Sequence, residues 1–118
     1  MPHTVCHFEI PAKDVEGLKK FYSELFGWKI EKFPGDMEYW MIETGGDGVG
    51  GGLMAKQHPQ HVPMNYILVE SVDEYSEKIK KLGGQIAVGK TAVGDMGWFA
   101  VGVDPDGNCI GLFETAEK

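Results

Sequence analysis

The sequence predicts an α+β fold in which one unit, a strand followed by a helix and three further strands (βαβββ), occurs twice in tandem. Two amphipathic helical segments are each preceded by a segment whose residues alternate in the period-two pattern of a strand. Three further strand-like segments follow each of these helices. The two halves of the 118-residue chain also correspond at an offset of about 56–59 residues. We expect a single domain over residues 1–118, with unit one at about 4–54, a linker at 55–63 and unit two at about 64–114.

The first unit begins with a strand over residues 4–10. Its two faces alternate, with Cys6, Phe8 and Ile10 on one and Val5, His7 and Glu9 on the other. We expect Pro11 to end this strand and Asp14 to cap a helix over 14–26. Gly27 should end the helix, because glycine adopts the left-handed conformation without a Cβ penalty. Turn-forming residues then separate three predicted strands at 28–33, 38–43 and 49–54.

The second unit repeats this order. A strand is predicted at 65–70, and Ser71 to Glu74 forms a capping box that begins a helix over 71–82. Three strands are predicted at 85–89, 97–103 and 108–114. Each unit then carries one helix on one face of a four-stranded sheet, so the other face needs a cover. Two curved mixed sheets that face each other would provide it and enclose a cleft, where we expect the site.

Composition restricts the class of partner. Eleven basic and eighteen acidic residues give a net charge of −7, which weighs against nucleic acid or an anionic membrane as the binding partner. The start of the sequence lacks the pattern of a signal peptide, and no apolar run approaches the roughly 20 residues that span a bilayer. Two cysteines, Cys6 and Cys109, are too few for a disulfide framework, so we expect reduced thiols and a cytoplasmic protein.

Several motifs carry a family resemblance over essentially the whole chain. They are His7-Phe8-Glu9-Ile10-Pro11, Phe21-Tyr22-x-x-x-Phe26-Gly27-Trp28, Gly51-Gly52-Leu53-Met54, Gly83-Gly84, Met96-Gly97-Trp98-Phe99 and Asp104-Pro105-Asp106-Gly107-Asn108. In order and spacing the chain resembles the vicinal oxygen chelate (glyoxalase/bleomycin-resistance/dioxygenase) superfamily, most of all its short members related to lactoylglutathione lyase. The resemblance implies the glyoxalase/bleomycin-resistance fold, with curved sheets around a cleft, and a homodimer.

The resemblance also implies a divalent metal that is chelated by four residues, two from each unit. In this sequence the corresponding positions fall on His7, Met64, Gly52 and Gly111. Glycine has no side chain and methionine offers a soft thioether, so only His7 suits a metal such as zinc, nickel or iron. A catalytic site usually needs about three protein ligands. We therefore expect no metal cofactor and do not expect glyoxalase I activity.

Strand alternation selects the candidate site residues. Glu9 and His7 share the face opposite the core, so Glu9 could act as a general base and His7 as an acid or hydrogen-bond donor. The simpler alternative is that the two side chains satisfy each other or backbone groups at the rim of the cleft. The candidate ligand-binding residues are Tyr66, Met64, Phe113, Trp40 and Trp98, although alternation does not decide whether the two tryptophans line the cleft or a subunit contact.

Two other features of the sequence are weaker candidates for a site. His58-x-x-His61 has a spacing that a metal tolerates, but Pro59 and Pro63 favour a solvated loop. Glu114 lies on the opposite strand face from Gly111, so it is not expected to replace a ligand there.

Three functions follow as hypotheses. The first is an enzyme, a lyase or relative, that acts on a small carbonyl or oxygenated compound through Glu9 and His7 without the full chelate. The second is a binding protein that sequesters a drug or toxin. The third is a metal-dependent lyase or dioxygenase with shifted ligands, namely His7, Glu9 and a loop histidine.

Overall fold

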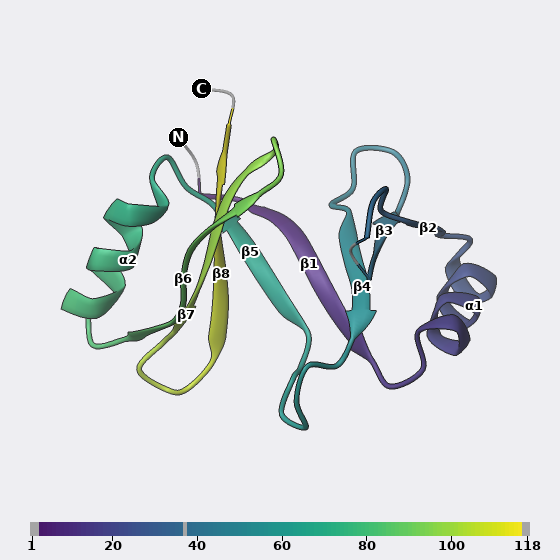
Figure 1. Cartoon of the computed structure of the whole chain (residues 1–118), viewed down its shortest axis with the longest axis horizontal. Coiled ribbons are helices and arrows are strands. Elements are labelled where there is room, and N and C mark those ends of the chain that lie inside the picture. The colour runs from purple at the N-terminus through teal and green to yellow at the C-terminus, as the bar shows by residue number, and fades with distance from the viewer. Residues whose placement is uncertain (1–2, 37, 117–118) are drawn as a thin grey trace. The chain divides into compact units, whose positions relative to one another are not determined.

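The computed structural model describes residues 3–36 and 38–116. Its elements follow the predicted order: β1 (Val5–Ala12), α1 (Val15–Phe26), β2 (Lys29–Lys32), β3 (Tyr39–Glu43), β4 (Gly51–Ala55), β5 (Met64–Leu68), α2 (Val72–Lys81), β6 (Gln85–Val93), β7 (Gly97–Val103) and β8 (Cys109–Thr115). The prediction of two βαβββ repeats in an α+β fold is confirmed (Figure 1). By their contacts, His7–Pro63 forms one compact unit, and the chain from Met64 onward forms the other together with the first residues up to Cys6.

The first unit has strands in the order β2-β3-β4-β1, with β1 parallel to β4 and the other pairs antiparallel. Helix α1 lies against one face of this sheet (Figure 1). Between helix and sheet lies a core of Ala12, Ile30, Ile42 and Leu53, of which Leu53 is fully buried. The burial of these side chains supplies the main favourable term for this unit.

Helix α1 begins and ends at the predicted residues. Asp14 has an extended backbone, and its carboxylate accepts a hydrogen bond from the Gly17 backbone N–H at 3.1 Å. Gly27 adopts the left-handed conformation with a φ of 73°, and its N–H donates to the Ser23 carbonyl. Both helix ends are therefore satisfied by local hydrogen bonds.

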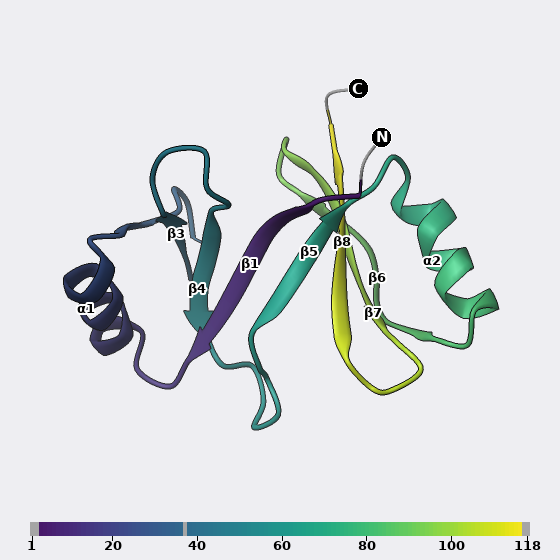
Figure 2. The ribbon, with the colours of Figure 1, turned by 180° about the vertical axis from the view of Figure 1, so that it is seen from behind.

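The second unit repeats the topology, with strands in the order β5-β8-β7-β6 and β5 parallel to β8 (Figure 2). Its core contains Val69, Val72, Ala100 and Leu112 under α2. The buried carboxylate of Glu114 accepts a hydrogen bond from the Val72 N–H at 2.9 Å, at the N-terminus of α2. There the helix dipole favours a negative charge. Glu114 thus faces the helix, as its predicted strand face requires.

β1 and β6 extend past the residues at which they were predicted to end. β1 continues through Pro11 to Ala12, because the even-numbered residues of β1 make its backbone hydrogen bonds on the β4 side. The Phe8 N–H donates to the Gly50 carbonyl, and the Ala12 carbonyl accepts from the Lys56 N–H. The missing N–H of Pro11 is therefore not needed on that side. β6 continues beyond Gly89 to Val93, since two register shifts absorb the irregular stretch.

Neither helix in the described part of the chain combines the length and apolar character needed to span a membrane.

Candidate functional site

The sheet of the first unit has two chemically distinct faces. Phe8 and Ile10 of β1 and Leu53 of β4 pack toward α1. His7 and Glu9 alternate with them and lie on the opposite face, where Glu9 is the register partner of Gly52 in β4. Side chains on this second face are available for a site because the core does not use them.

A hydrogen-bonded cluster occupies this second face. The His7 Nε2 atom lies 2.6 Å from the Tyr39 hydroxyl, and that hydroxyl donates to Glu9 Oε2 at 3.0 Å. The rings of His7 and Tyr39 are nearly parallel, with an interplanar angle of 16°. All three side chains are partly buried. A carboxylate, a phenol and an imidazole in one chain of hydrogen bonds can accept, donate and relay a proton.

Tyr39 is the member of this cluster that strand alternation within β1 does not predict. Its register partner in β4 is Met54, and its ring leans diagonally across the sheet to cover Gly52. A Cβ atom on Gly52 would overlap the hydroxyl and ring of Tyr39. Two features point to this contact. Tyr39 and Met41 alternate with the core residue Ile42, and Gly52 lies two residues from Met54, the register partner of Tyr39.

Burial lowers the pKa of His7 below its ordinary value of 6.5. Removing an imidazole from water disfavours its charged form, so His7 is neutral at pH 7. A neutral imidazole carries one N–H donor and one acceptor nitrogen.

This shift predicts how stability depends on pH. Between the depressed folded pKa and 6.5 the unfolded chain binds more protons at His7 than the folded chain does. The free energy of unfolding therefore falls as pH drops through this window and is restored above it. When the pH is lowered from about 7.5 to 5.5, the urea midpoint should fall less in His7→Asn than in the parent. Both proteins carry the same carboxylates, so the contribution of these groups to the fall cancels in the comparison. Equal losses in the two proteins would contradict a suppressed His7 protonation.

Tyr66, Met64 and Phe113 lie on the corresponding face of the second unit. The buried Tyr66 is the register partner of Gly111, and a Cβ atom on Gly111 would overlap its ring. Phe99 of β7 meets the Tyr66 ring edge-on at 6.3 Å and is the register partner of Phe113. The structure thus gathers an aromatic cluster around Tyr66.

Trp40 and Trp98 lie on the helix-facing sides of their sheets. Trp40 is the register partner of Leu53 and packs against the first core. Trp98 packs against the second core, with Lys90 Nζ 5.0 Å from its ring centroid. Successive residues of a strand point to opposite faces of the sheet, so each tryptophan lies on the face opposite the candidate site residues of its own unit. We therefore leave both tryptophans out of the site.

The residues at the four chelate positions do not fit a divalent metal. Gly52 and Gly111 offer no ligand atoms, and a tyrosine ring covers each of them. Met64 contributes only a thioether. Within residues 3–36 and 38–116, no group of three or more His, Cys, Asp or Glu side chains is placed to hold a metal. His7 alone cannot supply such a site.

The histidines of the linker lie together in a loop. The His58 and His61 rings stack at 5.5 Å, and His61 Nδ1 accepts a hydrogen bond from the Gln57 N–H at 3.1 Å. Both side chains are on exposed or partly exposed loop residues, as the flanking prolines predict.

Comparisons with known proteins agree with this architecture. Residues 4–45 match a family model described as bleomycin resistance protein-like N-terminal. Over 114 residues the chain is 31% identical to proteins named "Putative glyoxylase CFP32" in Mycobacterium bovis and Mycobacterium tuberculosis, which covers 91% of this chain and 44% of theirs. The chain thus spans less than half the length of these curated relatives.

Solved structures show the same fold at low identity. A hypothetical protein, BH1468, from Bacillus halodurans has a TM-score of 0.74 at 15% identity, with 100% of this chain and 98% of that chain covered. Methylmalonyl-CoA epimerase from Mycobacterium tuberculosis has a TM-score of 0.70 at 16% identity, with 98% and 93% covered. A methylmalonyl-CoA epimerase of similar fold, with a TM-score of 0.72 at 16% identity and 99% and 97% covered, has been solved with methylmalonyl-CoA. Its duplicated βαβββ units give the chain the glyoxalase/bleomycin-resistance fold, and its sequence is similar to a bleomycin resistance protein-like N-terminal model and to putative glyoxylases.

Proposed function

We propose that the chain binds a small carbonyl or oxygenated compound on the face that carries His7 and Glu9 and acts on it by proton transfer, without a divalent metal. The observation that supports this is the hydrogen-bonded cluster of Glu9, Tyr39 and His7 at the place where a chelate would need ligands. Glu9 is the base of the cluster, because an ionised carboxylate only accepts hydrogen bonds. Neutral His7 contributes an N–H without adding a charge.

The test follows hydrogen exchange in D₂O by proton NMR. A base that removes a proton next to a carbonyl returns deuterium, so exchange reports the step even where no product accumulates. We choose methylmalonyl-CoA, which a protein of the same fold binds, and dihydroxyacetone as probes. The parent should accelerate exchange of at least one probe over buffer. A protein that binds a probe in a thermal-shift assay but leaves its exchange rate unchanged would contradict the proton-transfer function.

The second candidate is a sequestering protein without catalysis. It is favoured by the match of residues 4–45 to a bleomycin resistance protein-like model and by the cluster of aromatic rings around Tyr66. Tight binding of an aromatic compound that Tyr66→Ala weakens, by a parent protein that accelerates exchange of neither probe, would favour this candidate over the enzyme.

The metal-free proposal makes a prediction of its own. Protein purified without added metal should contain no stoichiometric zinc, nickel, iron or manganese by elemental analysis, because three of the four chelate positions lack a suitable ligand atom. Stoichiometric metal that is lost in His7→Asn would contradict this. It would instead support the lyase or dioxygenase hypothesis, with Glu9 and a loop histidine as shifted ligands.

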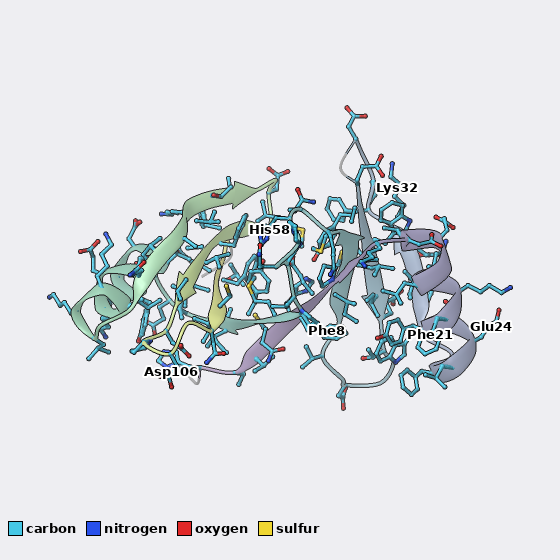
Figure 3. The ribbon with its side chains drawn as sticks, turned by 90° about the horizontal axis from the view of Figure 1, so that it is seen from below. Phe8, Phe21, Glu24, Lys32, His58 and Asp106 are labelled. Atoms are coloured by element: carbon cyan, nitrogen blue, oxygen red, sulfur yellow. The ribbon has the colours of Figure 1, made fainter. Side chains whose placement is uncertain are left out.

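We further propose a homodimer. Helix α1 carries exposed apolar side chains, with Phe21, Leu25 and Phe26 between 54% and 57% exposed, and Figure 3 shows Phe21 and Glu24 projecting from it. Such surface favours association. Sedimentation at tens of micromolar, an order-of-magnitude working range for weak contacts, should show the dimer. A monomer at that concentration would contradict it.

The free thiols of Cys6 and Cys109 are compatible with the cytoplasm, where we propose the protein acts.

A further inference from the structure

The direction of the hydrogen bonds in the cluster gives Tyr39 a specific role. An ionised Glu9 can only accept, so the Tyr39 O–H points to Glu9 Oε2, over 3.0 Å. The Tyr39 hydroxyl has no second proton to give. At 2.6 Å from it, His7 Nε2 must then be the donor, so neutral His7 carries its proton on Nε2. The order of donation is therefore His7 to Tyr39 to Glu9.

Such a chain strengthens the hydroxyl as a donor. A phenol oxygen that accepts an N–H becomes a better O–H donor, because hydrogen bonds in series polarise one another. Partial burial of His7, Tyr39 and Glu9 adds to this effect, since each hydrogen bond is electrostatically stronger away from bulk water.

Gly52 makes this arrangement possible. Its missing side chain leaves the space that the Tyr39 hydroxyl and ring occupy, and Glu9 is its register partner on β1. The Tyr39 hydroxyl and the Glu9 carboxylate are thereby held side by side on one face of the sheet. A ligand oxygen that accepts from the Tyr39 hydroxyl would place its neighbouring carbon beside the Glu9 carboxylate.

We propose that Tyr39 donates the hydrogen bond that stabilises the ligand's oxygen while Glu9 removes a proton from the adjacent carbon, so that the site takes carbonyl compounds with an acidic α C–H. This inference rests on the proposed function and names its substrate class and its oxygen-binding residue.

The step balances without any other reactant. Glu9 takes the α proton and the C–H bond breaks. That electron pair forms a C=C bond, and the C=O π pair moves onto oxygen, where the Tyr39 O–H and, behind it, the His7 N–H stabilise the enolate charge. Return of the proton from Glu9 to the face it left regenerates the ligand, with deuterium at that carbon in D₂O, and delivery of the proton to another atom of the enolate gives an isomer.

The first experiment needs no ligand. Nitrogen-15 NMR of the imidazole distinguishes the two neutral tautomers, and the parent should show His7 protonated on Nε2. In Tyr39→Phe, which keeps the ring and its packing, this preference should weaken. A parent protonated on Nδ1 would overturn the proposal, because Tyr39 would then donate to His7 and not toward Glu9.

The second experiment compares exchange of methylmalonyl-CoA and dihydroxyacetone in D₂O. Tyr39→Phe should slow exchange by about 10²–10³-fold, as for the loss of one oxyanion donor. Gly52→Ala should slow it as well, because its Cβ displaces Tyr39. Gly89→Ala, whose Cβ meets nothing within 4 Å, is the matched control and should exchange like the parent.

The outcomes separate the two proposals. If Tyr39→Phe and Gly52→Ala exchange like the parent while Glu9→Gln does not, Glu9 is the base and the role of Tyr39 is wrong. If Glu9→Gln also exchanges like the parent, or the parent accelerates neither probe, the proposed function itself is wrong and this inference falls with it.

Discussion

Glu9→Gln is expected to slow α-proton exchange by about 10²–10⁴-fold, the usual contribution of a general base. Glutamine keeps the shape of the side chain and can still accept from the Tyr39 hydroxyl, whose distance to Glu9 Oε2 is 3.0 Å. It cannot take a proton at neutral pH. His7→Asn should act in the same direction with a smaller effect, because His7 reaches the ligand only through Tyr39.

A matched control lies in the same unit. Glu43 is exposed and lies 3.9 Å from Lys29 on the surface, so Glu43→Gln removes the same charge without touching the cluster. Its exchange rate should equal that of the parent. If the protein sequesters its ligand instead, Glu9→Gln should change affinity by about 1–3 kcal/mol, the cost of disturbing a charged hydrogen bond. Equal loss in Glu43→Gln and Glu9→Gln would show a general effect of charge and contradict the role of Glu9.

Leu53→Ala is expected to lower the free energy of unfolding by about 2–5 kcal/mol. Leu53 is 0% exposed, packed between β4 and α1 with Ala12, Ile30 and Ile42. Truncation leaves a cavity that the rigid strand register cannot close. The free energy of unfolding is obtained from urea titration.

Leu82→Ala is the control for this change. Leu82 ends α2 and is 78% exposed, so its truncation should change the free energy of unfolding by less than about 0.5 kcal/mol. A Leu53→Ala variant as stable as Leu82→Ala would mean that the first core is not the main source of stability in its unit.

Local sequence rules predicted most of the fold. Asp14, Gly27 and Ser71 act at helix ends through contacts within three or four residues, so the sequence alone identifies them. The ends of β1 and β6 were wrong because they depend on which residues face a neighbouring strand and on register shifts. These are properties of pairing that a single strand does not encode.

The candidate site was predicted only in part. Strand alternation placed His7 and Glu9 on one face, away from Phe8. It could not find Tyr39, whose contact with both of them runs diagonally between strands and exists because Gly52 leaves room. The positions of Trp40 and Trp98 likewise required the cross-strand register, which identifies their faces as those of the cores.

Gly52 and Tyr39 share one volume, and this limits the routes by which the site can change in evolution. A glutamate at position 52 would need the space that the phenol fills, so the gain of a metal ligand and the loss of the tyrosine have to occur together. A single substitution at either position gives an intermediate with neither the ligand set of a metalloenzyme nor the hydrogen-bonded cluster. Metal-dependent and metal-free forms of this half of the fold are therefore separated by a barrier of paired substitutions, and not by one interchangeable residue.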